Sequence, residues 1–145
     1  MTAPELEPPW HPVQLRVSLP PRPDVLAVAR ELTRAFLALR PADGAPAPER
    51  IVEDALLLVT ELVSNARRHA PGLCRLHLSL HPCRLIVEVE DSSPLLPRLR
   101  PADLSGRVGG IGLHVVHRVA AYVRTVQIAG NGKRVEAELD WLDLL

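Results

Sequence analysis

The chain of 145 residues lacks several features that would indicate a function class. Basic and acidic residues number 17 each, so there is no net charge to attract nucleic acid or an anionic membrane. No apolar run reaches the roughly 20 residues that a membrane-spanning helix needs. The first residues, MTAPELEPPW, are acidic and rich in proline, unlike the basic start of a secretory signal. We therefore expect a cytoplasmic protein that binds neither nucleic acid nor membranes.

Cysteine is scarce as well, with Cys74 and Cys83 the only two. His77 and His81 lie close to them in sequence, which suggests a zinc site. In a strand over residues 74–80, however, Cys74 would face one side of the sheet and both histidines the other. Because the ligands of tetrahedral zinc must converge, we do not expect zinc here, and the reducing cytosol disfavours a disulfide.

The distribution of apolar residues predicts one domain over residues 13–145, preceded by a loose, proline-rich tail over residues 1–12. Its first half is expected to begin with a strand over Gln14–Leu19, followed by a helix that Asp24 caps. The residues of this helix that should face inward are Val25, Val28, Ala29, Leu32, Ala35, Phe36 and Leu39. A second helix over Pro48–Ala70 and strands over Cys74–Leu80 and Leu85–Glu90 should come next. A long loop over 92–107, a helix from about Gly112 to Tyr122, and strands over Arg124–Ala129 and Arg134–Trp141 around an Asn131-Gly132 turn should follow.

This order of elements lacks the regular strand–helix alternation of a doubly wound fold. It predicts an α+β fold of two layers, with helices on one face of a mixed, largely antiparallel sheet.

The helix over Pro48–Ala70 has a broad apolar stripe, which must face a core. Its members recur at helical spacing: Ile51, Ala55, Leu58, Val59, Leu62, Val63, Ala66 and Ala70. Glu61, Asn65 and His69 are spaced i, i+4, i+8 and so line up along one edge of the stripe. They could form the wall of a ligand site. They could also be a solvated flank, with His69 complementing the helix dipole.

Two further features are compatible with a nucleotide. Gly109, Gly110 and Gly112 precede a helix, where free N–H groups and the positive dipole end suit a phosphate chain, although glycines also serve as hinges. The sequence contains no GxxxxGK[ST] motif, and the glycines follow a long loop rather than an early strand, so neither a P-loop nor a Rossmann site is expected. Asp91, at the end of a strand, could accept a hydrogen bond from the amino group of a base, or could simply cap the loop.

Three segments carry a resemblance to a known family: ELVSNARRHA at 61–70, VEVEDSSP at 87–94 and GGIGLHVVHRVA at 109–120. They are similar to the N box and the two glycine boxes of the ATP-binding (Bergerat) fold that gyrase and histidine kinases share. The chain most resembles the short, single-domain bacterial branch, which comprises the anti-sigma-factor serine kinases and related actinobacterial ATP-binding regulators. That branch also has a late GK hairpin, here Gly132-Lys133. The resemblance covers about residues 13–141 and implies a histidine-kinase-like two-layer α/β sandwich.

The resemblance implies roles for the two best matched boxes. Asn65 would coordinate Mg²⁺, for which an oxygen ligand is suited. Glu61 would be the general base that accepts the proton of an attacking hydroxyl. Asp91 would bind the adenine amino group, and Arg68 and His69 would lie near the phosphates.

The second glycine box and the loop before it have implied roles too. Gly110, Gly112 and the N–H of Leu113 would hold the phosphates, beneath a lid formed by residues 92–108. Arg107, on that lid, would neutralise the charge of the transferred group. The sequence departs from the family where Ser92-Ser93-Pro94 replaces the usual DxGxG continuation and where Ile111 replaces Arg or Met.

The resemblance predicts an ATP- and Mg²⁺-dependent serine/threonine kinase of the anti-sigma type. It would phosphorylate an anti-sigma antagonist protein of the STAS type and sequester a sigma factor, and family likeness suggests a homodimer. A non-catalytic module that binds ATP and regulates a partner by contact is the alternative. A structural protein that does not use a nucleotide is a third.

Overall fold

The computed structural model describes residues 12–39, 46–69, 72–92, 119–128, 130 and 132–142. Its elements, in chain order, are β1 (Val13–Leu19), α1 (Val25–Leu37), α2 (Glu49–His69), β2 (Cys74–His81), β3 (Arg84–Asp91), β4 (Tyr122–Ile128) and β5 (Gly132–Asp140). Each predicted strand is present within two residues of its expected ends. None of the helices in the described ranges has the length and hydropathy of a membrane span.

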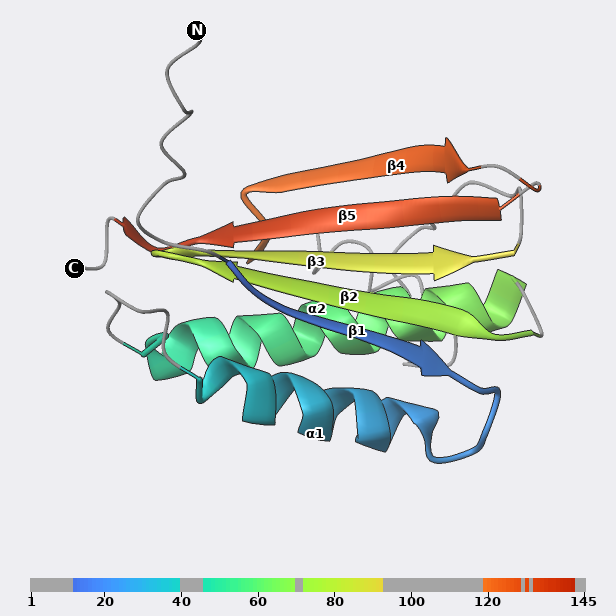
Figure 1. Ribbon diagram of the computed structural model, residues 1–145, viewed down its shortest axis with the longest axis horizontal. Coiled ribbons are helices and arrows are strands. Elements are labelled where there is room, and N and C mark those ends of the chain that lie inside the picture. The colour runs from blue at the N-terminus through green and yellow to red at the C-terminus, as the bar shows by residue number, and fades with distance from the viewer. Residues whose placement is uncertain are drawn as a thin grey trace, which may run out of the picture.

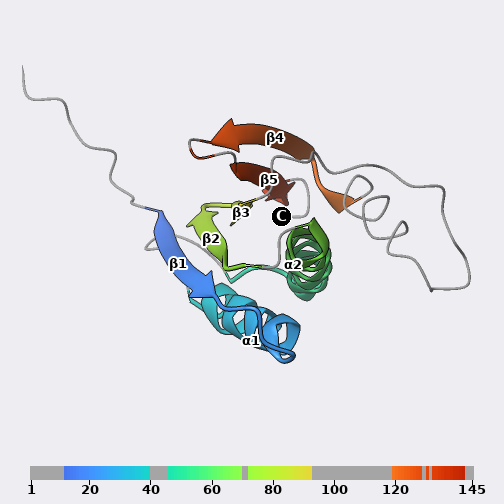
Figure 2. The same ribbon diagram turned by 90° about the vertical axis from the view of Figure 1, so that its right-hand side faces the viewer.

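The strands form one sheet in the order β1-β2-β3-β5-β4, and every pairing among them is antiparallel. Figures 1 and 2 show α1 and α2 side by side beneath one face of this sheet. The predicted two-layer α+β fold is therefore confirmed. We expected a mixed, largely antiparallel sheet, and the described part is antiparallel throughout.

The core lies between α2 and the sheet. The predicted stripe of α2 is buried from Ile51 to Ala66, while Ala70 lies outside the described residues. From the sheet, β2 contributes Leu76, Leu78 and Leu80, and β3 contributes Leu85, Val87 and Val89, all of them buried. Because strand residues alternate between faces, these apolar side chains all face the helices. The periodicity of 3.6 on the helix and 2 on the strands thus predicted the core correctly.

The helix α1 is rotated from its predicted orientation. Its buried side chains are Val25, Ala29, Thr33, Phe36 and Leu37, whereas Val28 is 38% exposed and Ala35 and Leu39 are exposed. Helical spacing allows either the predicted stripe with Val28 or the neighbouring stripe with Thr33 to face the core. In the folded protein, where α1 packs against α2, the stripe with Thr33 is buried. The Thr33 hydroxyl donates to the Ala29 carbonyl at 2.8 Å, which satisfies the buried oxygen.

Asp24 occupies the N-cap position but makes no side-chain capping hydrogen bond, so the predicted cap is wrong.

Two predictions near the C-terminus need correction. The helix expected to reach Tyr122 ends earlier, because Tyr122 already pairs with Glu138 in β4, and Val119 is the last helical residue. The β4–β5 hairpin exists, but Gly130 supplies its left-handed conformation, with φ of 85°. Gly132 belongs to β5, opposite Ile128. The hairpin that the Asn131-Gly132 pair predicted is confirmed, but Gly132 lies in the strand rather than in the turn.

The second face of the sheet is open and polar. His77 lies there, with Nδ1 2.8 Å from Glu88 Oε2 and Nε2 3.1 Å from Gln14 Oε1. Cys74 lies on the opposite face, buried in the core. The alternation that separated the cysteine from the histidines is confirmed. A hollow of about 510 Å³ on this open face is lined by Arg16, Arg75, His77, Glu88, Glu90 and Arg134, among others.

Candidate functional site

The last two turns of α2 carry the residues that the N-box resemblance singles out. Glu61 is half-buried, Asn65 is buried and Arg68 is exposed. His69 is the last residue of the helix, and its side chain lies outside the described part. Figure 1 shows that this end of α2 lies at the same end of the molecule as the terminus of β3 and the start of β5. The last turn of α2, which begins just after Asn65, and Asp91 at the terminus of β3 therefore lie at the same end of the fold.

Asn65 is a polar residue within the apolar stripe. Only 6% of it is exposed, between Leu62 and Ala66 on the face that packs on the sheet. Buried amides are normally satisfied by a protein, water or ligand partner. A carboxamide oxygen is a ligand that suits Mg²⁺, so Asn65 fits the role that the resemblance implies.

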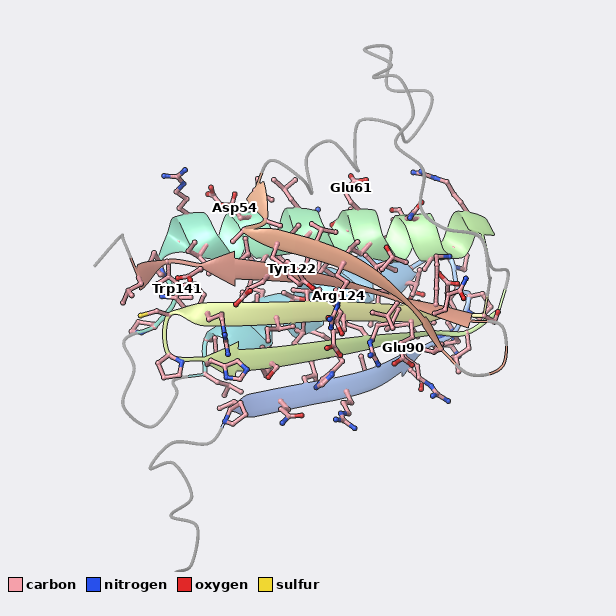
Figure 3. The ribbon with its side chains drawn as sticks, turned by 90° about the horizontal axis from the view of Figure 1, so that it is seen from above. Asp54, Glu61, Glu90, Tyr122, Arg124 and Trp141 are labelled. Atoms are coloured by element: carbon pink, nitrogen blue, oxygen red, sulfur yellow. The ribbon has the colours of Figure 1, made fainter. Side chains whose placement is uncertain are left out.

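Glu61 lies beside this buried face. Burial raises the pKa of its carboxyl group above the ordinary value, and the positive charge of Arg68 acts in the opposite direction. Figure 3 shows Glu61 and Asp54 on the same side of α2, with Glu61 nearer the end at which Glu90 lies. A carboxylate that binds protons more tightly than a solvated one is suited to accept a proton from a hydroxyl group.

Asp91 ends β3 and is 6% exposed. Its carboxylate contacts the Lys133 ammonium, with Nζ 2.8 Å from Oδ2 and 3.0 Å from Oδ1. The two residues lie directly opposite each other in the β3–β5 register. Both belong to the face of the sheet that packs against the helices, since Val89 and Val135, two residues away, are buried there.

The thiol of Cys74 connects α2 with Asp91. Burial is the main reason that the pKa of Cys74 is raised; the negative charge of Asp91 raises it further, and the positive charge of Arg67 lowers it. Cys74, the first residue of β2, is thus close enough to interact electrostatically with Arg67 near the end of α2 and with Asp91 at the end of β3. Shallow hollows lie at each of these places, one of about 330 Å³ beside Arg67 and Arg68 and one of about 200 Å³ beside Asp91.

Comparisons with known proteins agree with this arrangement. A model of the histidine kinase-like ATPase domain matches residues 19–139, which include both α2 and the β3–β5 pair. The chain belongs to the histidine kinase-like ATPase family. Membership in this family implies a site for ATP.

A solved structure has the same fold. The crystal structure of the RsbU and RsbW domains of Rv1364c from Mycobacterium tuberculosis matches with a TM-score of 0.63 at 16% sequence identity. The match covers 88% of this chain but 32% of the other, so this chain spans about a third of the length of the chain that it matches. At this identity the likeness concerns the fold alone. The comparison with curated proteins gave no match.

Several predicted site residues lie outside the described residues. They are Arg107 and most of the lid over 92–108, and the glycine-box residues Gly110, Gly112 and Leu113. Their roles remain predictions. Of the candidates that are described, Asn65 lies one turn before the end of α2, Asp91 ends β3, and Glu61 lies nearer the middle of α2 (Figure 3). Their roles remain predictions as well.

Sequence reasoning assigned no role to Lys133, although it noted the GK hairpin. The signal was available in the alternation of β5. Val135, Ala137 and Leu139 share the parity of Lys133 and are apolar, so a lysine in that series must point toward the core. A lysine in a core requires a buried partner, and the carboxylate opposite it in the sheet is Asp91.

Proposed function

We propose that this domain is an ATP- and Mg²⁺-dependent serine/threonine kinase of the anti-sigma-factor type. It transfers the γ-phosphoryl group of ATP to a serine of an anti-sigma antagonist protein of the STAS type. It binds a sigma factor when that antagonist is absent or phosphorylated.

The observation that carries this proposal is the joint placement of two buried polar side chains. Asn65 and Asp91, 26 residues apart in sequence, are each 6% exposed. Asn65 lies one turn before the end of α2 and Asp91 ends β3, and Figure 1 shows these two element ends at the same end of the molecule. A hydrophobic core would be more stable with apolar residues at such positions, so buried amide and carboxylate groups favour a ligand site. The family match favours ATP as that ligand.

The side chains divide the chemistry as follows. Asp91 accepts a hydrogen bond from the adenine amino group, and Asn65 holds the Mg²⁺ that screens the phosphate charge. Glu61 accepts the proton of the serine hydroxyl while the serine oxygen bonds to the γ-phosphorus and the bond to the ADP oxygen breaks. Two observations support this role for Glu61: it is half-buried on the same helix as Asn65, and its pKa is raised.

The first test is calorimetry of ATP binding with and without Mg²⁺. The wild type is expected to bind ATP, and Asn65→Ala to lose most of the affinity that Mg²⁺ adds. Thr60→Ala is the matched control, because Thr60 lies on the same helix and contacts Arg30 at 3.5 Å rather than the buried face. If the wild type binds neither ATP nor ADP, the proposed function is wrong.

A second test separates the kinase from a non-catalytic regulator. Labelled phosphate should pass from ATP to a serine of the antagonist protein, and Glu61→Ala should abolish this transfer while ATP binding persists. The sequence motifs of the anti-sigma kinases favour the catalytic form. Binding of ATP and of a partner without any transfer would favour the regulator instead.

A further inference from the structure

The pair formed by Lys133 and Asp91 is isolated from solvent. The side chain of Lys133 is 0% exposed and that of Asp91 2%, and the ammonium contacts both carboxylate oxygens, at 2.8 and 3.0 Å. Lys133 is the only lysine in the chain. A lysine is almost never buried to this degree unless it is paired.

Packing does not explain this pair. The other residues of β5 on the same face are Val135, Ala137 and Leu139, all buried and apolar. Two charges in a core lose their hydration, and an apolar pair of similar volume is often as stable or more stable. The presence of a charged pair here, at the one buried acid that the proposed function uses, therefore points to a role in ligand recognition.

We propose that Lys133 is a positioning residue that determines the purine selectivity of the site. This inference rests on the proposed function, in which Asp91 contacts the base. The ammonium holds the Asp91 carboxylate in one orientation and supplies its counter-charge. The carboxylate is then a hydrogen-bond acceptor only.

An obligate acceptor distinguishes the two common purines. Adenine presents an amino donor at position 6, which the carboxylate accepts. Guanine presents a carbonyl acceptor at the same position, so two acceptors would face each other in a buried site. A carboxylate can accept up to four hydrogen bonds, so its contacts with one ammonium do not prevent it from accepting another from adenine.

The test compares ADP with GDP, so that the result depends on neither Mg²⁺ nor phosphoryl transfer. Affinities are measured by calorimetry for the wild type, Lys133→Met and Lys133→Gln. The wild type should favour ADP by about 100-fold or more, because a site built for one hydrogen bond strongly rejects its mismatch. In Lys133→Met the Asp91 carboxylate loses the contact that holds it in one orientation, so its hydrogen bond to the adenine amino group should weaken. The ADP:GDP ratio should fall at least about tenfold.

Lys133→Gln provides the second arm, because it removes the charge but keeps a donor for the carboxylate and so disturbs folding less than Lys133→Met. It should also lower the ratio. A purely structural lysine would reduce both affinities by the same factor and leave the ratio unchanged. A ratio within twofold of the wild type in either folded variant overturns the inference while leaving the proposed function intact. A wild type that binds neither ADP nor ATP overturns the proposed function itself, and this inference with it.

Discussion

Gly132 and Asp91 approach each other so closely that a Cβ on Gly132 would lie 2.5 Å from the Asp91 carbonyl oxygen. The same Cβ would lie 3.2 Å from Cγ1 of Ile128, the residue opposite Gly132 in the hairpin. The start of β5 is thus in backbone contact with the residue that carries the proposed adenine contact. A change at this glycine must move β3, β5 or both.

Gly132→Ala should therefore lower both stability and nucleotide affinity. We expect a loss of about 1–3 kcal/mol in the free energy of unfolding, the range for overpacking a close contact, measured by urea denaturation. Affinity for ADP should fall as well, because Asp91 is displaced. Gly72→Ala is the control, since the nearest atom to its added Cβ is Ser92 Oγ at 3.9 Å. Equal stability of the two variants would contradict the close contact.

Glu61 should reduce the stability of the fold at neutral pH. Its pKa is raised in the folded state, so between the unfolded and folded pKa values the native protein binds more protons. The free energy of unfolding therefore falls as pH rises through that window, and above it the ionised carboxylate of Glu61 continues to destabilise the folded state. We expect Glu61→Gln to stabilise the protein slightly at pH 7, by about 0.5 kcal/mol or less for a half-exposed group, and to abolish phosphoryl transfer.

Asp54→Asn is the matched control for that substitution. Figure 3 shows Asp54 on the same side of α2, two turns before Glu61 and farther from the end at which Glu90 lies. It should leave transfer unchanged. A transfer rate that survives Glu61→Gln, or that Asp54→Asn lowers equally, would remove Glu61 from its role as the base.

The rate of transfer should decrease in acid as Glu61 becomes protonated. Burial raises the pKa of Glu61 and Arg68 lowers it, so Arg68→Gln should move the acid limb of the rate profile to higher pH. Rates are compared at saturating ATP, which removes any effect of Arg68 on nucleotide affinity. Arg67→Gln is the control: Arg67 influences Cys74 rather than Glu61. An acid limb that both variants leave in place would show that another group sets it.

Cys74 should react slowly with thiol reagents. It is buried, and its pKa is raised mainly by that burial and further by Asp91, so little of the reactive thiolate is present at neutral pH. In a Cys83→Ser background, alkylation by iodoacetamide at pH 7.5 should be at least about tenfold slower than for the half-buried Cys83 in Cys74→Ser. Adding Arg67→Gln to the Cys83→Ser background removes the positive charge that lowers the pKa of Cys74, so alkylation of Cys74 should become slower still. Equal rates at the two cysteines would show that the core end of β2 opens readily.

The predictions that succeeded rest on periodicity over many residues. The stripe of α2 repeats through more than four turns, and the alternation of β2 and β3 repeats through eight residues each, so local ambiguities average out. In α1 the predicted burial of Val25, Ala29 and Phe36 is confirmed, but only the tertiary structure shows that Thr33 is buried while Val28 is not. At the β4–β5 turn two glycines were available, and the register assigned the left-handed conformation to Gly130.

By itself the sequence determined the two-layer architecture, the buried stripe of α2 and the candidate residues Glu61, Asn65 and Asp91. It did so because helix and strand periods are local properties of the chain. Only the tertiary structure decided that Lys133 pairs with Asp91, 42 residues away, and that Asp91 and Arg67 both affect the pKa of Cys74. Pairing of this kind depends on which strands become neighbours and in which register. That choice is made by burial of the whole core rather than by any short segment.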